Sequence, residues 1–488
     1  MENLLLGIPT ILLCSTGFYF AWRAAKAGNF QVAIFLIVAG GLFLRIYAGT
    51  DFFLHEWDER YHALVAKNLM EQPFKPTLYR HPVLPYDYTD WSSNYIWLHK
   101  QPAPLWAMAL SLGIFGVNEI ALRLPSILLS SLAIWLTYRI ACHFVGRRMA
   151  LLAAFLQAIH GLIIELTSGR VATDHIDLFF LFFIELGIYF SIRFIKTPKW
   201  YFSILIGIST GLGILTKWMP ALIVILIWGL LAVHKKLPWP QIFVHAFIIF
   251  GATALTFLPW QIYIVHTFPQ EAQREYAYNV MHLFEDLGDH GEPWYYYLNR
   301  MRIIYGELIY LPLIWFIYIK GQRLFKNRPV GLSLLTWIWI PVIFFSFAVT
   351  KMQAYTIFSA PAFFILTALF FRYFNIWKEK FFFPKYISNL ILALLVLLPA
   401  RYSIERVKPF TIRERRPEWA ENFKALEKQF PLDSTTVVFN MPKPIEFMFY
   451  TNAIAYPFLP ETKTLDSLSH SGYKLLKYES KTLKKIGN

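Results

Sequence analysis

Long apolar segments alternate with short polar ones along most of the chain. Windows of about 19–20 residues, long enough to cross a bilayer as a helix, recur from Leu4 to Tyr402. The sequence therefore predicts an all-α polytopic membrane protein with about 12 transmembrane helices. The predicted spans are 4–22, 30–48, 121–145, 148–166, 177–195, 200–216, 219–235, 241–264, 302–320, 330–349, 355–373 and 386–402.

Two long loops interrupt this pattern, at residues 49–120 and 265–301. In the first loop, Pro102 to Val117 is apolar but too short to span a bilayer, so we expect a helix lying at the membrane interface. Earlier in the same loop, apolar residues recur at helical spacing after Asp58, which predicts an amphipathic helix. These apolar residues are Tyr61, Leu64, Val65 and Leu69.

The tail of the chain, residues 403–488, has a different pattern from the predicted membrane domain, residues 1–402. Residues 435–440 read as a strand, Pro444 to Tyr450 as a short helix, and residues 453–457 as a second strand before a proline-rich turn. We expect a small soluble α/β domain.

Charge gives the predicted orientation. The chain has 488 residues, of which 16% are charged, with a formal net charge of +15. Lysine and arginine concentrate in one set of loops, which the positive-inside rule places in the cytoplasm. Most carboxylates fall in loops 49–120, 167–176 and 265–301, on the other side. We therefore expect a multi-pass protein of the cell membrane whose long loops and C-terminal domain are extracytoplasmic, and no nucleic-acid partner.

An acidic pair, Asp58 and Glu59, follows the second predicted span. A carboxylate at the mouth of a span is costly unless water, a partner or a substrate uses it. At a helix N-terminus the backbone field favours the ionised form, which suits a general base acting on a lipid-borne substrate. Asp174 is a further acid in the second outer loop. Capping of a helix is the alternative for each of these residues.

Basic residues are scarce in the outer loops and lie near span ends. Against the positive-inside bias, they suggest binding of an anion such as a lipid phosphate, with snorkelling to lipid headgroups as the alternative. Lys351 and Tyr355 are four residues apart and can point the same way from a helix start. The candidate cations are Lys100, Arg170, Lys217 and Lys351.

Histidines in the outer loops are candidate ligands of a divalent metal. His99, His282 and His290 offer imidazole nitrogens, but no spacing specifies a site.

The order of several short motifs resembles the GT-C glycosyltransferases of the protein O-mannosyltransferase and aminoarabinose transferase type. No single motif is specific, but together they cover roughly residues 30–375. The motifs are Trp57-Asp58-Glu59-Arg60-Tyr61, residues 99–105 from His99 to Leu105, residues 115–126, Thr173-Asp174, Thr216-Lys217 before Pro220, residues 290–297, and Lys351-x-x-x-Tyr355.

This resemblance implies a GT-C-like transferase that uses a polyprenyl-phosphate sugar on the outer side of the membrane. The family's catalytic carboxylate matches Asp58, with Glu59 beside it and Asp174 as the second-loop acid, and its phosphate-contacting lysine and tyrosine match Lys100 and Tyr355. A one-step displacement would invert the anomeric configuration. The acceptor is a lipid, a glycan or a protein. A transporter or flippase that moves a lipid-linked sugar without chemistry is the alternative.

The sequence departs from the family at two places. His99 precedes Lys100 where the aminoarabinose transferases tend to have an acidic metal ligand, and Glu285 and Asp286 follow His282 where an arginine is expected nearby.

Overall fold

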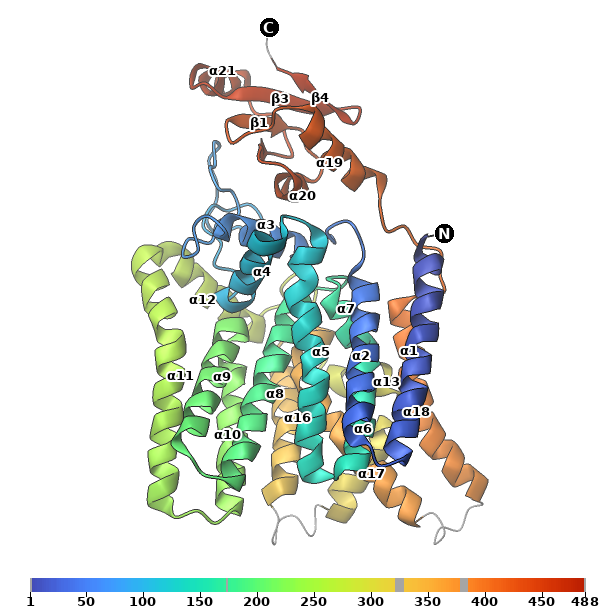
Figure 1. The fold of residues 1–488 in the computed structure, drawn as a ribbon. Coiled ribbons are helices and arrows are strands. Elements are labelled where there is room, and N and C mark those ends of the chain that lie inside the picture. The colour runs from blue at the N-terminus through green and yellow to red at the C-terminus, as the bar shows by residue number, and fades with distance from the viewer. Residues whose placement is uncertain (1, 173, 321–328, 378–384, 487–488) are drawn as a thin grey trace.

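The computed structural model describes residues 2–172, 174–320, 329–377 and 385–486. These residues form a bundle of long helices with a small α/β unit stacked on one end (Figure 1). The N-terminus lies at the same end of the bundle as the α/β unit. An even number of membrane crossings, which the sequence predicts, would give this arrangement.

Apolar helices build the bundle. In chain order they are α1 (Glu2–Lys26), α2 (Phe30–Gly49), α5 (Glu119–Phe144), α6 (Arg147–Ala158), α7 (Gly161–Thr167), α8 (Asp174–Lys196), α9 (Trp200–Lys217), η1 (Met219–Leu222), α10 (Ile223–His234), α11 (Trp239–Thr267), α13 (Tyr296–Tyr305), η2 (Glu307–Ile309), α14 (Tyr310–Trp315), η3 (Phe316–Lys320), α16 (Pro329–Phe347), η4 (Gln353–Ser359), α17 (Ala360–Trp377) and α18 (Lys385–Val407).

The number of membrane spans is smaller than predicted if length is the criterion. Within the described residues, eight helices are long and apolar enough to cross a bilayer, and ten if each of two bent pairs counts as one span. The pair that meets at Gly306 bends by 117°, since this glycine has a φ of +91° that an L side chain rarely adopts. Helical segments occupy all twelve predicted windows, but twelve spans are not confirmed.

Three further helices lie at the end of the bundle that carries the α/β unit (Figure 1). They are α3 (Asp58–Leu69), α4 (Pro102–Phe115) and α12 (Pro269–Phe284). The first two confirm the helices predicted within loop 49–120. Leu110 and Ile114 of α4 are about two-thirds exposed, as expected for a helix that places apolar side chains at a membrane interface.

The C-terminal unit is a four-stranded sheet with three helices. Strand order is β2-β1-β3-β4, with β1 parallel to both β2 and β3, and β3 antiparallel to β4. The predicted strand, helix and second strand are confirmed as β1, α20 and β2. Its elements are α19 (Glu418–Gln429), β1 (Thr436–Phe439), α20 (Pro444–Tyr450), β2 (Ile454–Ala455), α21 (Thr462–His470), β3 (Lys474–Glu479) and β4 (Thr482–Lys485).

The C-terminal unit and α3 share one hydrophobic core. Tyr61 and Leu64 of α3 belong to the same buried cluster as Phe447 and Phe449 of α20. The bundle has its own larger cluster. Because α3 is amphipathic at 3.6-residue spacing and packs between these two bodies, its position depends on both.

Candidate functional site

A cavity of about 470 Å³ is lined in part by α12 and by the segment just before α4, which lie at the end of the bundle that carries the α/β unit (Figure 1). One part of its lining is apolar and comes from the η1 turn and the end of α16, with Met219, Pro220, Phe344 and Phe345. The other part carries polar and ionisable side chains. They include His99, Lys100, Lys217, His282 and Tyr355.

Asp58 reaches the cavity through an ion pair. It is the first residue of α3, and its Oδ2 lies 3.1 Å from Nζ of Lys100, which lines the cavity. The side chains of Asp58 and Lys100 are 18% and 21% exposed. Burial opposes ionisation of Asp58, but Lys100, His62 and His99 together outweigh it, with Lys100 as the main contributor, and the pKa of Asp58 is held well below its usual value. Asp58 is therefore an ionised carboxylate at neutral pH.

A second lysine enters the cavity from the end of α9. The ammonium of Lys217 donates a hydrogen bond to Asp177 of α8 and lies 4.5 Å from the ring centre of Tyr355. Trp218, the next residue, has a φ of +62°. Such backbone strain in a non-glycine residue clusters at functional sites. Electrostatic interactions connect both Lys217 and Tyr355 to Asp58.

Asp177 is a site residue that the sequence prediction did not include. In the sequence, Asp177 is a carboxylate at the start of an apolar span, where a charged side chain is energetically unfavourable. A helix cap explained it equally well. Only the structure shows that its partner is Lys217, forty residues away. The predicted acid Asp174 begins α8, and its side chain lies outside the described part of the chain.

Glu59 belongs to a buried network rather than to the cavity. Its carboxylate accepts hydrogen bonds from Arg123 at 2.6 Å and 2.8 Å, from the backbone N–H of His55 at 2.8 Å, and lies 3.2 Å from Nε2 of His175. Neither Glu59 nor Arg123 is exposed. Burial raises the pKa of Glu59, but Arg123, His175 and His55 together lower it by more, so the pKa is below its usual value. We therefore infer that Glu59 has a structural role and stabilises the loop beside Asp58.

Substitution Glu59→Gln is expected to destabilise the protein. Removing one partner of a fully buried ion pair costs about 3–5 kcal/mol, because the other charge remains buried. The thermal unfolding midpoint in detergent should fall by several degrees. Glu56→Gln is the matched control, since Glu56 pairs with Lys443 at the surface and its side chain is 73% exposed. Equal midpoints for the two variants would contradict a structural role for Glu59.

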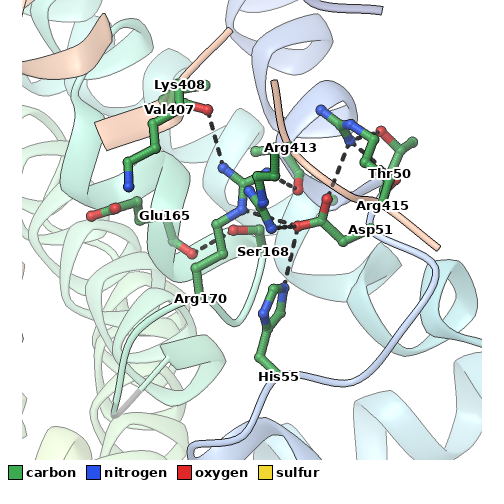
Figure 2. Close-up of polar contacts among 12 residues, drawn as sticks. Thr50, Asp51, His55, Glu165, Ser168, Arg170, Val407, Lys408, Arg413 and Arg415 are labelled. Atoms are coloured by element: carbon green, nitrogen blue, oxygen red, sulfur yellow. Dashed lines mark hydrogen bonds and ion pairs between the residues drawn. The ribbon is translucent and has the colours of Figure 1, made fainter. Parts of the chain in front are cut away.

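Arg170, a predicted phosphate ligand, lies in another cluster, centred on Asp51 (Figure 2). Its Nε is 3.1 Å from Asp51, and its other nitrogens donate to the carbonyls of Ala48 and Val407. Arg413 and Arg415 bind the same buried carboxylate. The sequence did not reveal this, because the partners of Asp51 lie up to 364 residues along the chain. Arg170 is thus used to join loops.

Lys351, another predicted phosphate ligand, does not line the cavity. Its ammonium donates to the carbonyls of Ala348, Val349 and Glu292, the last at 2.6 Å. The prediction assumed that Lys351 and Tyr355 share a helix face, but η4 begins only at Gln353, and Thr350 forms a β-bridge with Gly291. Tyr355 alone of the pair reaches the cavity.

The predicted metal ligands are only partly brought together. His99 and His282 line the cavity and His290 does not. His99 lies 3.3 Å from Glu275 and stacks on Trp91, and Nδ1 of His282 donates to the carbonyl of Tyr278. Across the described ranges, no three histidine, cysteine, aspartate or glutamate side chains are grouped to hold a metal ion. A divalent metal at His99, His282 and His290 stays a prediction.

Comparisons with known proteins match part of this chain by sequence. Residues 99–263 match the family described as dolichyl-phosphate-mannose-protein mannosyltransferase. An undecaprenyl phosphate-alpha-4-amino-4-deoxy-L-arabinose arabinosyl transferase of Yersinia pestis (strain Pestoides F) is 28% identical over 282 residues, which cover 54% of this chain and 49% of the relative. The chain thus spans about half the length of the curated relatives it matches.

Solved structures match nearly the whole chain. The crystal structure of ArnT from Cupriavidus metallidurans bound to undecaprenyl phosphate has a TM-score of 0.61 at 15% identity, covering 90% of this chain and 88% of that one. The archaeal oligosaccharyltransferase AglB from Archaeoglobus fulgidus, in complex with an inhibitory peptide and a dolichol-phosphate, has a TM-score of 0.56 at 12% identity, covering 91% and 69%.

The chain therefore has the fold of the GT-C membrane glycosyltransferases. Sequence and fold together confirm its resemblance to the protein O-mannosyltransferase and aminoarabinose transferase type.

Proposed function

We propose that the protein is a membrane glycosyltransferase that transfers a sugar from a polyprenyl-phosphate donor to an acceptor. The name of the Yersinia relative specifies an undecaprenyl-phosphate-linked sugar, and the two solved structures are bound to undecaprenyl phosphate and to a dolichol-phosphate. This chain offers a cavity suited to the same class of donor.

One observation carries the proposal: an apolar wall and a pair of lysines meet in one cavity, directly beside an ionised aspartate. A prenyl chain would lie along Met219, Pro220, Phe344 and Phe345. The phosphate would lie where Lys100, Lys217 and Tyr355 converge, because ammonium and hydroxyl groups are good donors to phosphate oxygens.

The proposed reaction is a single displacement at the anomeric carbon. An acceptor hydroxyl or amine forms the new bond to that carbon while the bond to the phosphate oxygen breaks. The acceptor's proton passes to Asp58, and the electron pair leaves with polyprenyl phosphate. Lys100 and Lys217 stabilise the charge that grows on the departing phosphate. Such a displacement inverts the anomeric configuration.

Lys100 links donor binding to the strength of the base. Its ammonium is paired with Asp58 and keeps the pKa of that carboxyl low, which makes Asp58 a weak base. A donor phosphate placed against Lys100 would draw the ammonium away. Asp58 would then lose its main stabilising charge, and its pKa would rise while the donor is bound. The base is thus strongest when there is a donor to react with.

We place the reaction on the extracytoplasmic side. The cavity lies at the end of the bundle near the C-terminal unit, and the lysine- and arginine-rich loops lie between the other helix ends. These include the loops at Arg147 and at Lys235–Lys236. A lipid, a glycan and a protein all remain acceptors that this chemistry allows.

Release of polyprenyl phosphate tests the proposal. Purified protein is incubated with a panel of polyprenyl-phosphate sugars and candidate acceptors, and the lipid products are separated. We expect one donor to yield free polyprenyl phosphate together with a glycosylated acceptor. Movement of an intact lipid-linked sugar across a liposome, without its cleavage, would overturn the proposal in favour of a transporter.

A further inference from the structure

The contacts between α3 and the C-terminal unit differ from those between α3 and the cavity. Asp58 and His62 lie four residues apart on one face of the helix, and Asp58 meets Lys100 there. Arg60, Leu64 and Lys67 follow one another at spacings of four and three residues on a second face. This second face lies against α20 (Figure 1).

Lys67 makes the strongest of these contacts. Its Nζ donates hydrogen bonds to the carbonyls of Met448 at 2.9 Å and Phe449 at 3.1 Å, and to that of Thr451. The last carbonyls of a helix have no partner within it, and the negative end of its dipole favours a cation. At the C-terminus of α20, Lys67 provides hydrogen-bond donors for these carbonyls and a positive charge at the negative end of the dipole.

Further polar contacts join the same surfaces along the first turns of α3. Arg60 lies 3.4 Å from the fully buried Glu446, and Lys443 lies 2.7 Å from Glu56. Just before the helix, the backbone N–H of Leu54 donates to the hydroxyl of Tyr450 at 3.2 Å. The last part of the loop that leads to Asp58 is thus held against the C-terminal unit, at Leu54 and Glu56.

We infer that the C-terminal unit positions the catalytic helix, with Lys67 as the positioning residue that fixes α3 and so the reach of Asp58. This inference rests on the proposed function for its effect on rate. The helix rises about 1.5 Å per residue, so Asp58 and Lys67 are separated by roughly 13 Å along the helix axis. A small tilt at Lys67 therefore displaces Asp58. A misplacement of about 1 Å is enough to cost as much as 10²-fold in rate.

Lys67→Met tests the inference. We expect kcat to fall about 10- to 100-fold, with the KM for the donor changed by less than about twofold, since donor-binding Lys217 and Tyr355 are not on α3. Amide hydrogens of α3 should exchange faster in Lys67→Met. Lys67→Arg keeps the cation and should restore most of the wild-type kcat and most of the protection of α3 amides from exchange. Lys474→Met is the control, because Lys474 pairs with Asp433 at the surface, and should match wild type.

A paired variant guards against misfolding of Lys67→Met. Arg60→Met combined with Glu446→Gln removes both charges of one pair and should give a weaker form of the same two effects. Unchanged kcat and unchanged exchange in α3 would overturn the inference. If no variant or wild-type protein releases polyprenyl phosphate, the proposed function fails. Faster exchange in α3 would then still support the anchoring role, and unchanged exchange would refute it.

Discussion

Asp58→Asn is expected to lower kcat by about 10²–10⁴-fold, the contribution of a general base. Asparagine keeps the shape of the side chain but cannot accept the acceptor's proton. The loss should fall on chemistry and not on donor binding. Lys100 loses its ion pair with Asp58 in this variant, so we expect polyprenyl phosphate to bind at least as tightly as in wild type. Single-turnover rates and direct titration of polyprenyl phosphate measure the two effects separately.

Asp87→Asn is the matched control for this experiment. Asp87 is an exposed aspartate of the same loop, and its carboxylate accepts hydrogen bonds from the backbone N–H and the hydroxyl of Thr89. The Asp87→Asn variant should have the kcat of the wild-type protein. Thermal unfolding of both variants checks that the loop is intact. An Asp58→Asn protein that folds, binds polyprenyl phosphate and still turns over at the wild-type rate would show that another group is the base.

Lys100→Met is expected to lower kcat/KM for the donor by about 10²–10³-fold, the usual effect of removing one group that stabilises developing charge. It should also change the dependence of kcat/KM on pH. In wild type the pKa of Asp58 is held far below its usual value of about 3.9, so Asp58 stays ionised and active as pH falls to that value. Without Lys100 its pKa rises, and activity is lost at a higher pH.

The groups that face Asp58 decide how large this shift is. Lys100 is the main one, and His62 and His99 also favour its ionised form. Lys75→Met serves as the control, because Lys75 lies over the ring of Tyr95 in the same loop and does not line the cavity. It should keep the wild-type pH profile. An unshifted acid limb in Lys100→Met would contradict the proposed interaction of Lys100 with the base.

The sequence predicted the parts of the fold that depend on local pattern. Apolar windows located the bundle helices, and helical spacing after Asp58 located α3. The short helix Pro444–Tyr450 was predicted with the bounds that the structure has. The span count was less accurate, because window length alone cannot show that a helix bends at Gly306. The hairpin of β3 and β4 was not predicted, since its lysine-rich strands lack clear alternation.

The site was predictable only where a residue's neighbours in sequence determine its role. The structure brings together Asp58, Lys100, Lys217 and Tyr355 at one end of the bundle. Arg170 and Lys351 are also basic and also lie near predicted span ends, but Arg170 pairs with Asp51 and Lys351 donates to backbone carbonyls. Such partners come from distant segments. The sequence shows which charges are present, but it does not show which of them neutralise one another.

A structure determined with polyprenyl phosphate tests the central claim most directly. We expect the phosphate between Lys100, Lys217 and Tyr355, the first isoprene units along Phe344 and Phe345, and Lys100 withdrawn from Asp58. A phosphate bound elsewhere, with the Lys100–Asp58 pair unchanged and the cavity filled by protein side chains, would contradict the assignment of this cavity as the donor site.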